Sequence, residues 1–296
     1  MKHVITGGAG HISKPLALAL LKAGHKVTIL GRNPENLESV TEDGAIPAIG
    51  SLEDADFLRT AFAGADAAYL MIPPNFLVDD FRAYQRKVIR NYVDAVKANG
   101  VKKLVVLSSV GAHMGQGAGP VDGLAELEQA ITTELPGTDA IFLRPAFFFY
   151  NLFQQAGLVK HMGIMGANYP APNGKLFLVD TADIAATAFE YLNKGEFTGK
   201  QVVNLYSDER TPDEIASVLS AAIGKSGIPW VIFPDDQALQ GMVQSGLKPA
   251  MAQDYLDMGI AIRNGAMQAE FLAQGARQGE KRLEDFAPAF AAFYNH

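Results

Sequence analysis

The sequence predicts a doubly wound α/β fold, in which a parallel β-sheet carries helices on both faces and a small, mostly helical lobe follows at the C-terminal end. Three observations support this prediction. Apolar runs of strand length alternate with helical segments as far as about residue 205. These runs show little alternation with polar residues, as expected for strands covered on both faces. A glycine-rich turn, Gly7–Ser13, joins the first strand to the first helix.

The sheet is predicted to contain six strands before residue 145 and a last strand after residue 200. Each strand is a short apolar run that ends near a glycine, a proline or a polar residue. Pro145 breaks the sixth run, because proline cannot donate a hydrogen bond to a neighbouring strand. The predicted strands are 2–6, 26–30, 45–49, 67–72, 103–108, 139–144 and 202–205, with a further short strand at 176–179.

The predicted helices are bounded by residues that commonly start and stop helices. Gly24 and Gly100 end the first and the longest helix, and Pro34 stands at a first helical position. The longest helix, 76–99, has one apolar face, formed by Leu77, Phe81, Tyr84, Val88, Tyr92 and Val96. The other helices predicted before residue 205 are 13–23, a segment that begins at 33–34, a segment through 57–62, 124–135 and 183–192.

The turn Gly7–Ser13 has the pattern of a dinucleotide-binding turn. Gly7 stands where the chain must turn sharply out of the strand, and Gly10 stands where a side chain would collide with a pyrophosphate. Ser13 occupies the position where a third glycine often stands. The backbone N–H groups of residues 10–13 lie at a helix N-terminus, which favours phosphate groups. We therefore predict that this part of the fold binds a nicotinamide dinucleotide.

The composition changes after Thr211, where helical segments replace the alternation of strands and helices. Four helices are predicted here, at 212–223, 235–245, 251–262 and 283–294. The segment 150–173 is rich in glycine, proline and aromatic residues, and we predict an insertion that covers a site. The resulting domains are a dinucleotide-binding domain formed by 1–150 and about 176–205, and a substrate or partner lobe formed by about 151–175 and 206–296.

Arg32 indicates which nicotinamide dinucleotide is bound. It ends the second strand, where NAD-specific folds place an acidic residue that binds the ribose 2′-hydroxyl. A guanidinium offers two parallel donors to a 2′-phosphate, and no carboxylate stands next to it in the sequence. The alternative is a solvated surface arginine. On this argument we predict NADP(H) as the cofactor.

The composition resembles that of ordinary soluble enzymes and excludes several functions. Of the 296 residues 48% are apolar, and the net charge of −7 opposes binding to a phosphate backbone, so nucleic acid is not an expected partner. The absence of cysteine excludes thiolate catalysis, and the six histidines lack the spacing of a metal site. No apolar run spans a bilayer and no signal segment precedes the first strand, so we expect a cytoplasmic location without a membrane partner.

Several motifs taken together resemble one known family. They are Thr6-Gly-Gly-Ala-Gly-His-Ile-Ser13, Gly31-Arg-Asn-Pro34, Leu107-Ser-Ser109, Leu143-Arg-Pro-Ala-Phe-Phe148 followed by Asn151-Leu152, and Val179-Asp-Thr-Ala-Asp-Ile-Ala185. By these motifs the chain resembles the NmrA-like, atypical short-chain dehydrogenase/reductase family, and the resemblance weakens after about Gly224. It implies a Rossmann-type fold. Relatives include NADPH-dependent quinone and dye reductases, isoflavone-type reductases, and redox-sensing regulators that bind the nucleotide without turning it over.

The resemblance also implies which residues line the nucleotide. The pair Ser51–Leu52 would lie near the adenine, with Ser51 in place of an aspartate that many relatives carry. The segment after the fourth strand and the serine pair after the fifth strand would complete the lining. The implied nucleotide-binding residues are Gly7, Gly10, His11, Ile12, Ser13, Arg32, Ser51, Leu52, Met71, Ile72, Pro73, Ser108, Ser109 and Pro145.

The proton donor that short-chain dehydrogenases use is missing. These enzymes commonly act through a Tyr-x-x-x-Lys pair, in which the lysine lowers the pKa of the tyrosine. No tyrosine here has a lysine four residues later, and no lysine occurs between Lys103 and Lys160. Reduction of an ordinary ketone, which produces a basic alkoxide, is therefore disfavoured. A quinone or conjugated dye accepts hydride to give a weakly basic anion that water can protonate, so the protein need supply only proximity and orientation.

Other side chains near the expected site have two readings each. His113 lies in the loop after the fifth strand and is the candidate catalytic residue, but it fits an exposed loop histidine equally well. The aromatic residues after Pro145 could stack on a flat substrate or pack within the lobe. Asp180 and Asp183 fit a turn and a helix cap. The aromatic residues are Phe147, Phe148, Phe149, Tyr150 and Phe153.

Two functions follow from these observations. The first is an NADPH-dependent reductase of quinone-like or other conjugated acceptors, whose partner is an aromatic or quinone-like small molecule. The second is a redox sensor that binds NADP(H) and reports its state to a regulatory protein partner. An isoflavone-type or epimerase-like enzyme is disfavoured by the missing lysine. A homodimer, formed across the long helix 76–99, stays open at this stage.

Overall fold

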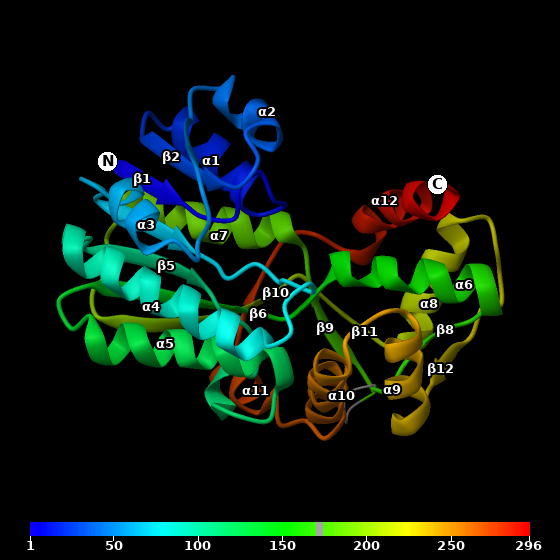
Figure 1. Ribbon diagram of the computed structural model, residues 1–296. Helices are drawn as coiled ribbons and strands as arrows, with labels where there is room; N and C mark the ends of the chain where they lie inside the picture. The colour runs from blue at the N-terminus through cyan, green and yellow to red at the C-terminus, as the bar shows by residue number, and fades with distance from the viewer. Residues whose placement is uncertain (170–173) are drawn as a thin grey trace. The chain divides into compact units, whose positions relative to one another are not determined.

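The computed structural model describes residues 1–169 and 174–296. Its main element is an eight-stranded sheet with the order β13-β10-β6-β5-β4-β1-β2-β3 (Figure 1). The pairs β1–β2, β2–β3, β1–β4, β4–β5, β5–β6 and β10–β13 are parallel. The strands are β1 (Lys2–Ile5), β2 (Lys26–Gly31), β3 (Ile46–Ile49), β4 (Ala67–Leu70), β5 (Lys103–Leu107), β6 (Asp139–Pro145), β10 (Lys200–Tyr206) and β13 (Arg277–Gln278).

The direction in which strands are added reverses between β1 and β4. The chain passes from β1 outward to β2 and β3, and then returns to the other side of β1 to build β4, β5 and β6. At such a reversal the loops that leave neighbouring strands diverge, and open α/β sheets bind ligands in the crevice between them. The doubly wound parallel sheet predicted from the sequence is confirmed, and the reversal lies at the strand that carries the glycine turn.

Helices cover both faces of this sheet. On one face α3, α4 and α5 pack buried side chains such as Leu58, Val88 and Leu127 against the strands. On the other face α1 and α7 lie together, and the His25 ring after α1 contacts the Asn193 side chain of α7 at 2.9 Å (Figure 1). These helices are α1 (Ser13–Lys22), η1 (Glu35–Leu37), α2 (Glu38–Thr41), α3 (Ala55–Ala61), α4 (Phe81–Asn99), α5 (Asp122–Glu134) and α7 (Thr181–Lys194).

The other elements form two small sheets and a helical C-terminal region. One sheet has the order β11-β9-β7 and the other pairs β12 with β8. The strands are β7 (Phe147–Phe148), β8 (Met165–Ala167), β9 (Leu176–Val179), β11 (Asp208–Arg210) and β12 (Trp230–Ile232). The helices are η2 (Ala112–Met114), η3 (Gly119–Val121), η4 (Phe149–Gln154), α6 (Gln155–Met162), α8 (Pro212–Ala222), α9 (Asp235–Gln244), α10 (Pro249–Arg263), α11 (Ala269–Gln274) and α12 (Leu283–Asn295).

The chain divides into two compact units. The first unit consists of Met1–Ser109, Gly123–Arg144 and Ile184–Val203, and it holds most of the large sheet. The second unit consists of Val110–Asp122, Pro145–Asp183 and Asn204–His296. The domain limits given above from the sequence stay a prediction.

The long helix α4 begins later than its apolar periodicity suggests. It starts at Phe81, because the Asp80 side chain accepts a hydrogen bond from the Ala83 N–H at 2.8 Å and caps the helix there. Before it, the Asn75 side chain accepts from the Leu77 N–H at 3.2 Å, a local turn that competes with helix. Leu77 is 88% exposed and lies before the helix, so its prediction as part of the apolar helical face was wrong.

The structure adds details that the sequence did not predict. The predicted short strand at 176–179 is β9, which belongs to a small sheet with β7 and β11, and the short strand β13 pairs beyond β10 at the edge of the large sheet. The segment 150–173, predicted as an insertion, contains most of η4 together with α6 and β8. Its last residues, 170–173, lie outside the described residues.

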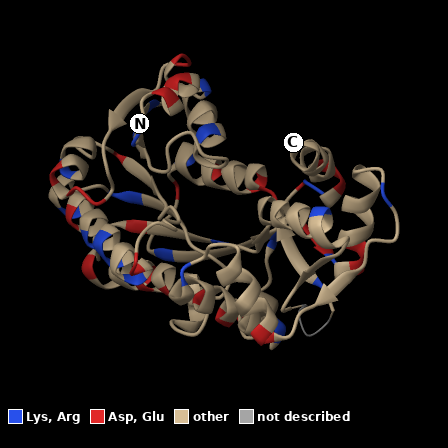
Figure 2. Ribbon diagram, turned by 45° about the vertical axis from the view of Figure 1, so that its right-hand side comes forward, with Lys and Arg blue, Asp and Glu red and all other residues tan. Residues whose placement is uncertain are grey.

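Both acidic and basic residues are spread over the helices of each unit (Figure 2). Within residues 1–169 and 174–296, no helix is long and apolar enough to cross a membrane. Over the same residues, no group of three acidic or histidine side chains is placed to hold a metal ion.

His3 is a titratable side chain inside the first unit. It lies on β1 with 0% exposure, and in the described part of the chain neither ring nitrogen has a hydrogen-bond partner. Its ring meets the His25 ring edge-on, with the centroids 4.8 Å apart. Burial, and then the charge of His25, lowers the pKa of His3 from 6.5 to about 4. The unfolded chain therefore binds this proton more readily than the folded chain.

We predict that the free energy of unfolding falls as the pH drops from 6.5 to about 4, because His3 is protonated in the unfolded chain only. Above pH 6.5 the ring is neutral in both states, so it adds no slope there. The pKa difference corresponds to about 3 kcal/mol. Urea titrations at several pH values in this range give the free energy of unfolding at each pH. This free energy should depend clearly less on pH for His3→Leu than for the wild type. An equal pH dependence would mean that His3 takes up a proton in the folded chain as easily as in the unfolded chain.

Candidate functional site

The glycine turn between β1 and α1 requires glycine at its first position for two reasons. Gly7 has a φ of +96°, in the left-handed region that other residues rarely adopt. A Cβ on Gly7 would also lie 2.5 Å from the Ser13 Oγ and 3.1 Å from the Met71 side chain. At Gly10 a Cβ would lie 3.0 Å from the Gly7 carbonyl oxygen, which is a tight contact. The turn can therefore bring its backbone close to a ligand.

The N-terminus of α1 leaves donors free. Ile12 caps this helix without a side-chain acceptor, and no acidic residue stands in the first turn. Within residues 1–169 and 174–296, the N–H groups of Ile12 and Ser13 have no hydrogen-bond acceptor. His11 is exposed beside them. Unsatisfied N–H groups at a helix N-terminus favour an anion such as phosphate.

Thr6 connects this turn to the loop after β4. The Ser13 hydroxyl donates to the Thr6 carbonyl oxygen at 2.7 Å, so the side chain of Ser13 is used within the protein. The Thr6 hydroxyl donates to the Tyr69 carbonyl oxygen at 3.1 Å and accepts from the Met71 N–H at 2.9 Å. Thr6 and Ser13 are buried, where such bonds gain strength from the low dielectric.

The predicted residues after β2 and β3 follow in the same unit. Arg32 is exposed, and no carboxylate forms an ion pair with it in the part of the chain that the structure describes. The Ser51 Oγ accepts from the Glu53 N–H at 3.2 Å, a bond that stabilises its own turn. The Leu52 carbonyl oxygen accepts from the Asn91 side chain of α4 at 2.9 Å. These three residues lie on loops at the carboxyl end of parallel strands, where doubly wound folds hold their ligands.

The segment Met71–Pro73 leaves β4 and is held by α4. The Tyr92 hydroxyl donates to the Met71 carbonyl oxygen at 2.7 Å, and the Tyr84 hydroxyl donates to the Pro73 carbonyl oxygen at 3.2 Å. Ile72, between them, is 8% exposed. Both tyrosines were assigned from the sequence to the apolar face only, and their hydroxyl contacts were not predicted.

The serine pair after β5 has two different environments. Ser108 is 2% exposed and its hydroxyl donates to the Glu128 carboxylate on α5. Glu128 also accepts two hydrogen bonds from Arg144, at 3.0 Å and 2.6 Å. Ser109 is partly exposed. Of the pair, Ser109 is therefore the residue whose side chain can meet a ligand.

The Glu128–Arg144 pair is a buried ion pair that sequence reasoning missed. The two side chains are 10% and 8% exposed. Removing one partner of such a pair commonly costs about 3–5 kcal/mol, because the other charge stays buried without compensation. An acidic residue on a helix and an arginine on the next strand give no sequence signal of pairing until the fold brings them together.

The last two predicted residues lie in the second unit. Pro145 is buried at the end of β6, and its carbonyl oxygen accepts from the Val110 N–H at 3.0 Å. The His113 Nδ1 lies 3.7 Å from the Glu270 carboxylate of α11, and the side chains are 23% and 22% exposed. Glu270 also accepts from the Gln274 side chain at 3.1 Å. His113 therefore has a carboxylate beside it that can orient its ring.

The aromatic residues after Pro145 pack mainly against each other and α12. Phe149 is 1% exposed and stacks on Phe286, with the ring centroids 5.8 Å apart. Phe153 lies 4.9 Å from Phe286 and 4.8 Å from Phe293. Tyr150 meets Phe153 edge-on at 5.2 Å. Packing within the second unit therefore accounts for Phe149 and Phe153, whereas Tyr150 is 45% exposed.

Asp180 behaves as predicted and Asp183 does not. The Asp180 side chain accepts from the Ala182 N–H at 2.7 Å, as a residue that starts a helix does. Asp183 is buried, and it accepts from the Ser207 hydroxyl at 2.6 Å and the Lys281 N–H at 3.1 Å. Asp183 is thus not a cap. It joins the end of β10 to the segment before α12.

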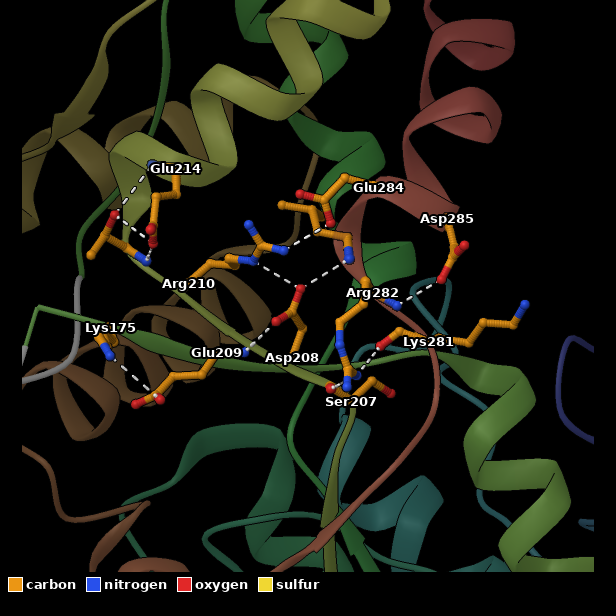
Figure 3. Close-up of polar contacts among 12 residues, drawn as sticks. Lys175, Ser207, Asp208, Glu209, Arg210, Glu214, Lys281, Arg282, Glu284 and Asp285 are labelled. Carbon is orange, nitrogen blue, oxygen red and sulfur yellow. Dashed lines mark hydrogen bonds and ion pairs between the residues drawn. The ribbon is translucent and has the colours of Figure 1, made fainter.

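A polar network next to it ties β11 to the start of α12 (Figure 3). Asp208 accepts from the Arg210 side chain at 2.8 Å and from the Leu283 N–H at 3.0 Å. Arg210 also donates to Glu284 at 2.8 Å. The Arg282 guanidinium donates to backbone carbonyl oxygens, among them that of Ser207 at 2.6 Å. These charged groups satisfy one another, so we assign them to the stability of the second unit.

The fold and the turn define a doubly wound α/β protein with a Rossmann-type glycine turn. The chain belongs to the NmrA-like family, whose model matches residues 2–242.

The chain is also similar to individual proteins of known sequence. The chain is 26% identical over 276 residues to an agroclavine dehydrogenase of Claviceps fusiformis, covering 90% of this chain and 88% of that protein. It is 33% identical to an uncharacterised Schizosaccharomyces pombe protein over 116 residues, only 38% of each chain.

Two solved structures share the fold over almost the whole length. An NADPH-dependent quinone oxidoreductase of Escherichia coli, complexed with NADPH, has a TM-score of 0.79 at 20% identity, covering 97% of this chain and 99% of that chain. A triphenylmethane reductase of a Citrobacter species, complexed with NADP(H), has a TM-score of 0.77 at 21% identity, covering 98% and 99%.

Proposed function

We propose that the chain is an NADPH-dependent reductase that transfers hydride to quinone-like or other conjugated acceptors. The proposal depends mainly on the N-terminus of α1, where backbone N–H donors are free. Arg32 lies in the same unit, is exposed, and has no ion-pair partner in the described part of the chain. The quinone reductase and the dye reductase with the same fold are complexes with NADPH and NADP(H), which supports the proposal.

The residues present fit NADP(H). Gly7 and Gly10 leave the backbone bare where the pyrophosphate would pass, and the Ile12 and Ser13 N–H groups would bind its oxygens. The Arg32 guanidinium would bind the 2′-phosphate. The remaining predicted contacts are part of the same proposal: His11, Ser51, Leu52, Met71, Ile72, Pro73, Ser108, Ser109 and Pro145.

The chain's own contribution to the reaction is binding and orientation. NADPH supplies a hydride from its nicotinamide ring. The Ser108 hydroxyl donates to Glu128 and is buried, so it is not available as an acid toward a substrate. Because reduction of a quinone gives a weakly basic product, water can supply the proton. His113, which lies 3.7 Å from the Glu270 carboxylate, is the candidate for any proton transfer that the protein does provide.

A redox sensor that binds NADP(H) without turnover is the second candidate. The missing Tyr-x-x-x-Lys pair favours it as well, because a sensor needs no proton donor. A sensor would show nucleotide-dependent binding of a protein partner together with negligible turnover. The cytoplasmic location and the homodimer remain predictions under either function.

We predict that the chain oxidises NADPH in the presence of at least some members of a panel of benzoquinones, naphthoquinones and triphenylmethane dyes. Their reduced forms are delocalised, so the missing donor does not block the reaction. Loss of the NADPH absorbance with time, corrected for the reaction without protein, measures this. Aliphatic ketones should give no turnover. If no quinone or dye supports NADPH oxidation, the reductase proposal is wrong and the redox sensor is the remaining candidate.

We predict that Arg32→Ala weakens NADPH binding by about tenfold or more and changes NADH binding by less than about twofold. The reason is that a charge-assisted hydrogen bond to the 2′-phosphate is lost, and NADH lacks this phosphate. Isothermal titration with both nucleotides measures the two affinities. Arg59→Ala, which changes another exposed arginine of the same unit, is the matched control. An equal loss for NADPH and NADH would show that Arg32 does not contact the 2′-phosphate.

A further inference from the structure

Helix α4 directs three polar side chains at the loops that follow β3 and β4. Asn91 donates to the Leu52 carbonyl oxygen at 2.9 Å, and Tyr92 donates to that of Met71 at 2.7 Å. Tyr84 donates to the Pro73 carbonyl oxygen at 3.2 Å. The three donors are 8%, 1% and 8% exposed, and Tyr84 lies about two turns before the adjacent pair Asn91 and Tyr92. We call Tyr84, Asn91 and Tyr92 the α4 clamp.

The clamp fixes which way the peptide groups of the β4 loop face. A trans peptide is planar, so its N–H points opposite to its C=O. Because the Met71 C=O is bonded to Tyr92 on α4, the Ile72 N–H must point away from α4. Within residues 1–169 and 174–296 this N–H has no hydrogen-bond acceptor. Ile72 is 8% exposed as a residue, and an N–H without a partner in such a residue gains from a ligand or water that accepts from it.

The same face of α4 lies close to the charged groups around the Arg32 loop. Burial, then the charge of Glu53, raises the pKa of Tyr84 to about 12, and the charge of Arg32 acts in the opposite direction. Lys87, also on α4, lies 3.8 Å from the Glu53 carboxylate. The charge of Lys87 partly offsets the negative charge of Glu53, which directly follows the predicted adenine contacts Ser51 and Leu52. Of the clamp residues, Tyr84 is therefore the one whose hydroxyl lies within electrostatic range of Arg32, the predicted 2′-phosphate contact.

We propose that Tyr84, Asn91 and Tyr92 are positioning residues for the dinucleotide, which set the peptide groups of the two loops against it without touching it. The proposal rests on the proposed function, because the loops matter only if a dinucleotide lies along them. Asn91 acts on the loop predicted near the adenine, while Tyr84 and Tyr92 act on the loop after β4. The two halves of the clamp should therefore affect different parts of the nucleotide.

The competing explanation is that these bonds merely stabilise the fold. The chain provides matched controls that separate the two. Asn99, on the same helix, donates to the Arg59 carbonyl oxygen at 3.0 Å, which lies on α3 and not on a predicted binding loop. Tyr69 is fully buried, and in the described residues its hydroxyl has no partner. Asn99→Leu thus removes the same amide donor away from the predicted binding loops, and Tyr69→Phe removes a buried phenol hydroxyl that, in the described part of the chain, bonds to no binding loop.

The test is isothermal titration of the full chain with NADPH and with 2′,5′-ADP, which carries only the adenosine end and its 2′-phosphate. Five variants are compared with the wild type: Tyr84→Phe, Asn91→Leu, Tyr92→Phe, Asn99→Leu and Tyr69→Phe. Urea unfolding of each variant reports the structural cost separately. One neutral hydrogen bond corresponds to about fivefold in an equilibrium constant, so this is the change expected from each clamp variant.

We predict that Asn91→Leu weakens the binding of both ligands about fivefold. Tyr84→Phe and Tyr92→Phe should weaken the binding of NADPH more than that of 2′,5′-ADP. The two controls should stay within about twofold for both ligands even where their stability falls. If the wild type binds NADPH and the clamp variants bind as tightly as the controls, the positioning role of the clamp is wrong and the proposed function is unaffected. A wild-type chain that binds neither ligand would overturn both.

Discussion

The left-handed turn at Gly7 is the constraint on which the candidate site depends. No side chain fits there, because a Cβ would meet the Ser13 Oγ and the Met71 side chain. The same packing lets Ser13 bond to Thr6, and Thr6 in turn bonds to the backbone at Tyr69 and Met71. The start of α1 and the loop after β4 are therefore fixed by one small buried network. A change in either segment is therefore expected to affect the position of the other.

This arrangement explains how a protein can hold a dinucleotide with few charged side chains. Among the predicted contacts, Arg32 is the one permanent cation, and most of the others are backbone groups or small side chains. Backbone donors are useful only if their peptide groups face the ligand. The turn sets this direction for the first helix. Helix α4 sets it for the loops after β3 and β4, because its side chains donate hydrogen bonds to carbonyl oxygens of these loops.

Much of the fold could be predicted from local sequence. The continuous apolar strands, the glycine turn and the end of α4 at Gly100 follow from residue types and short spacings. The start of α4 could not, because its apolar pattern extends past the Asp80 cap that decides where the helix begins. Likewise Asp183 has the position of a cap, but its partners Ser207 and Lys281 come from distant parts of the chain.

The candidate site could be predicted in position but not in its supporting contacts. The glycines and Arg32 are recognisable because a strand precedes them and a helix or loop follows. Asn91 and Leu52, or Glu128 and Arg144, meet only after the sheet has formed, so no spacing in the sequence indicates either pair. Such long-range polar pairs decide which donors stay free, as the contrast between Ser108 and Ser109 shows.

Under the proposed function, bound NADPH reacts although the usual proton donor is missing. A single-turnover experiment tests this directly: the chain is loaded with NADPH that carries deuterium at the transferred position of C4 and is mixed rapidly with a benzoquinone. We predict one fast loss of the reduced-nicotinamide absorbance that is slower with deuterium than with hydrogen. The NADP⁺ formed should carry no deuterium, and the rate should change little with pH. Bound NADPH that stays reduced after mixing would contradict this prediction.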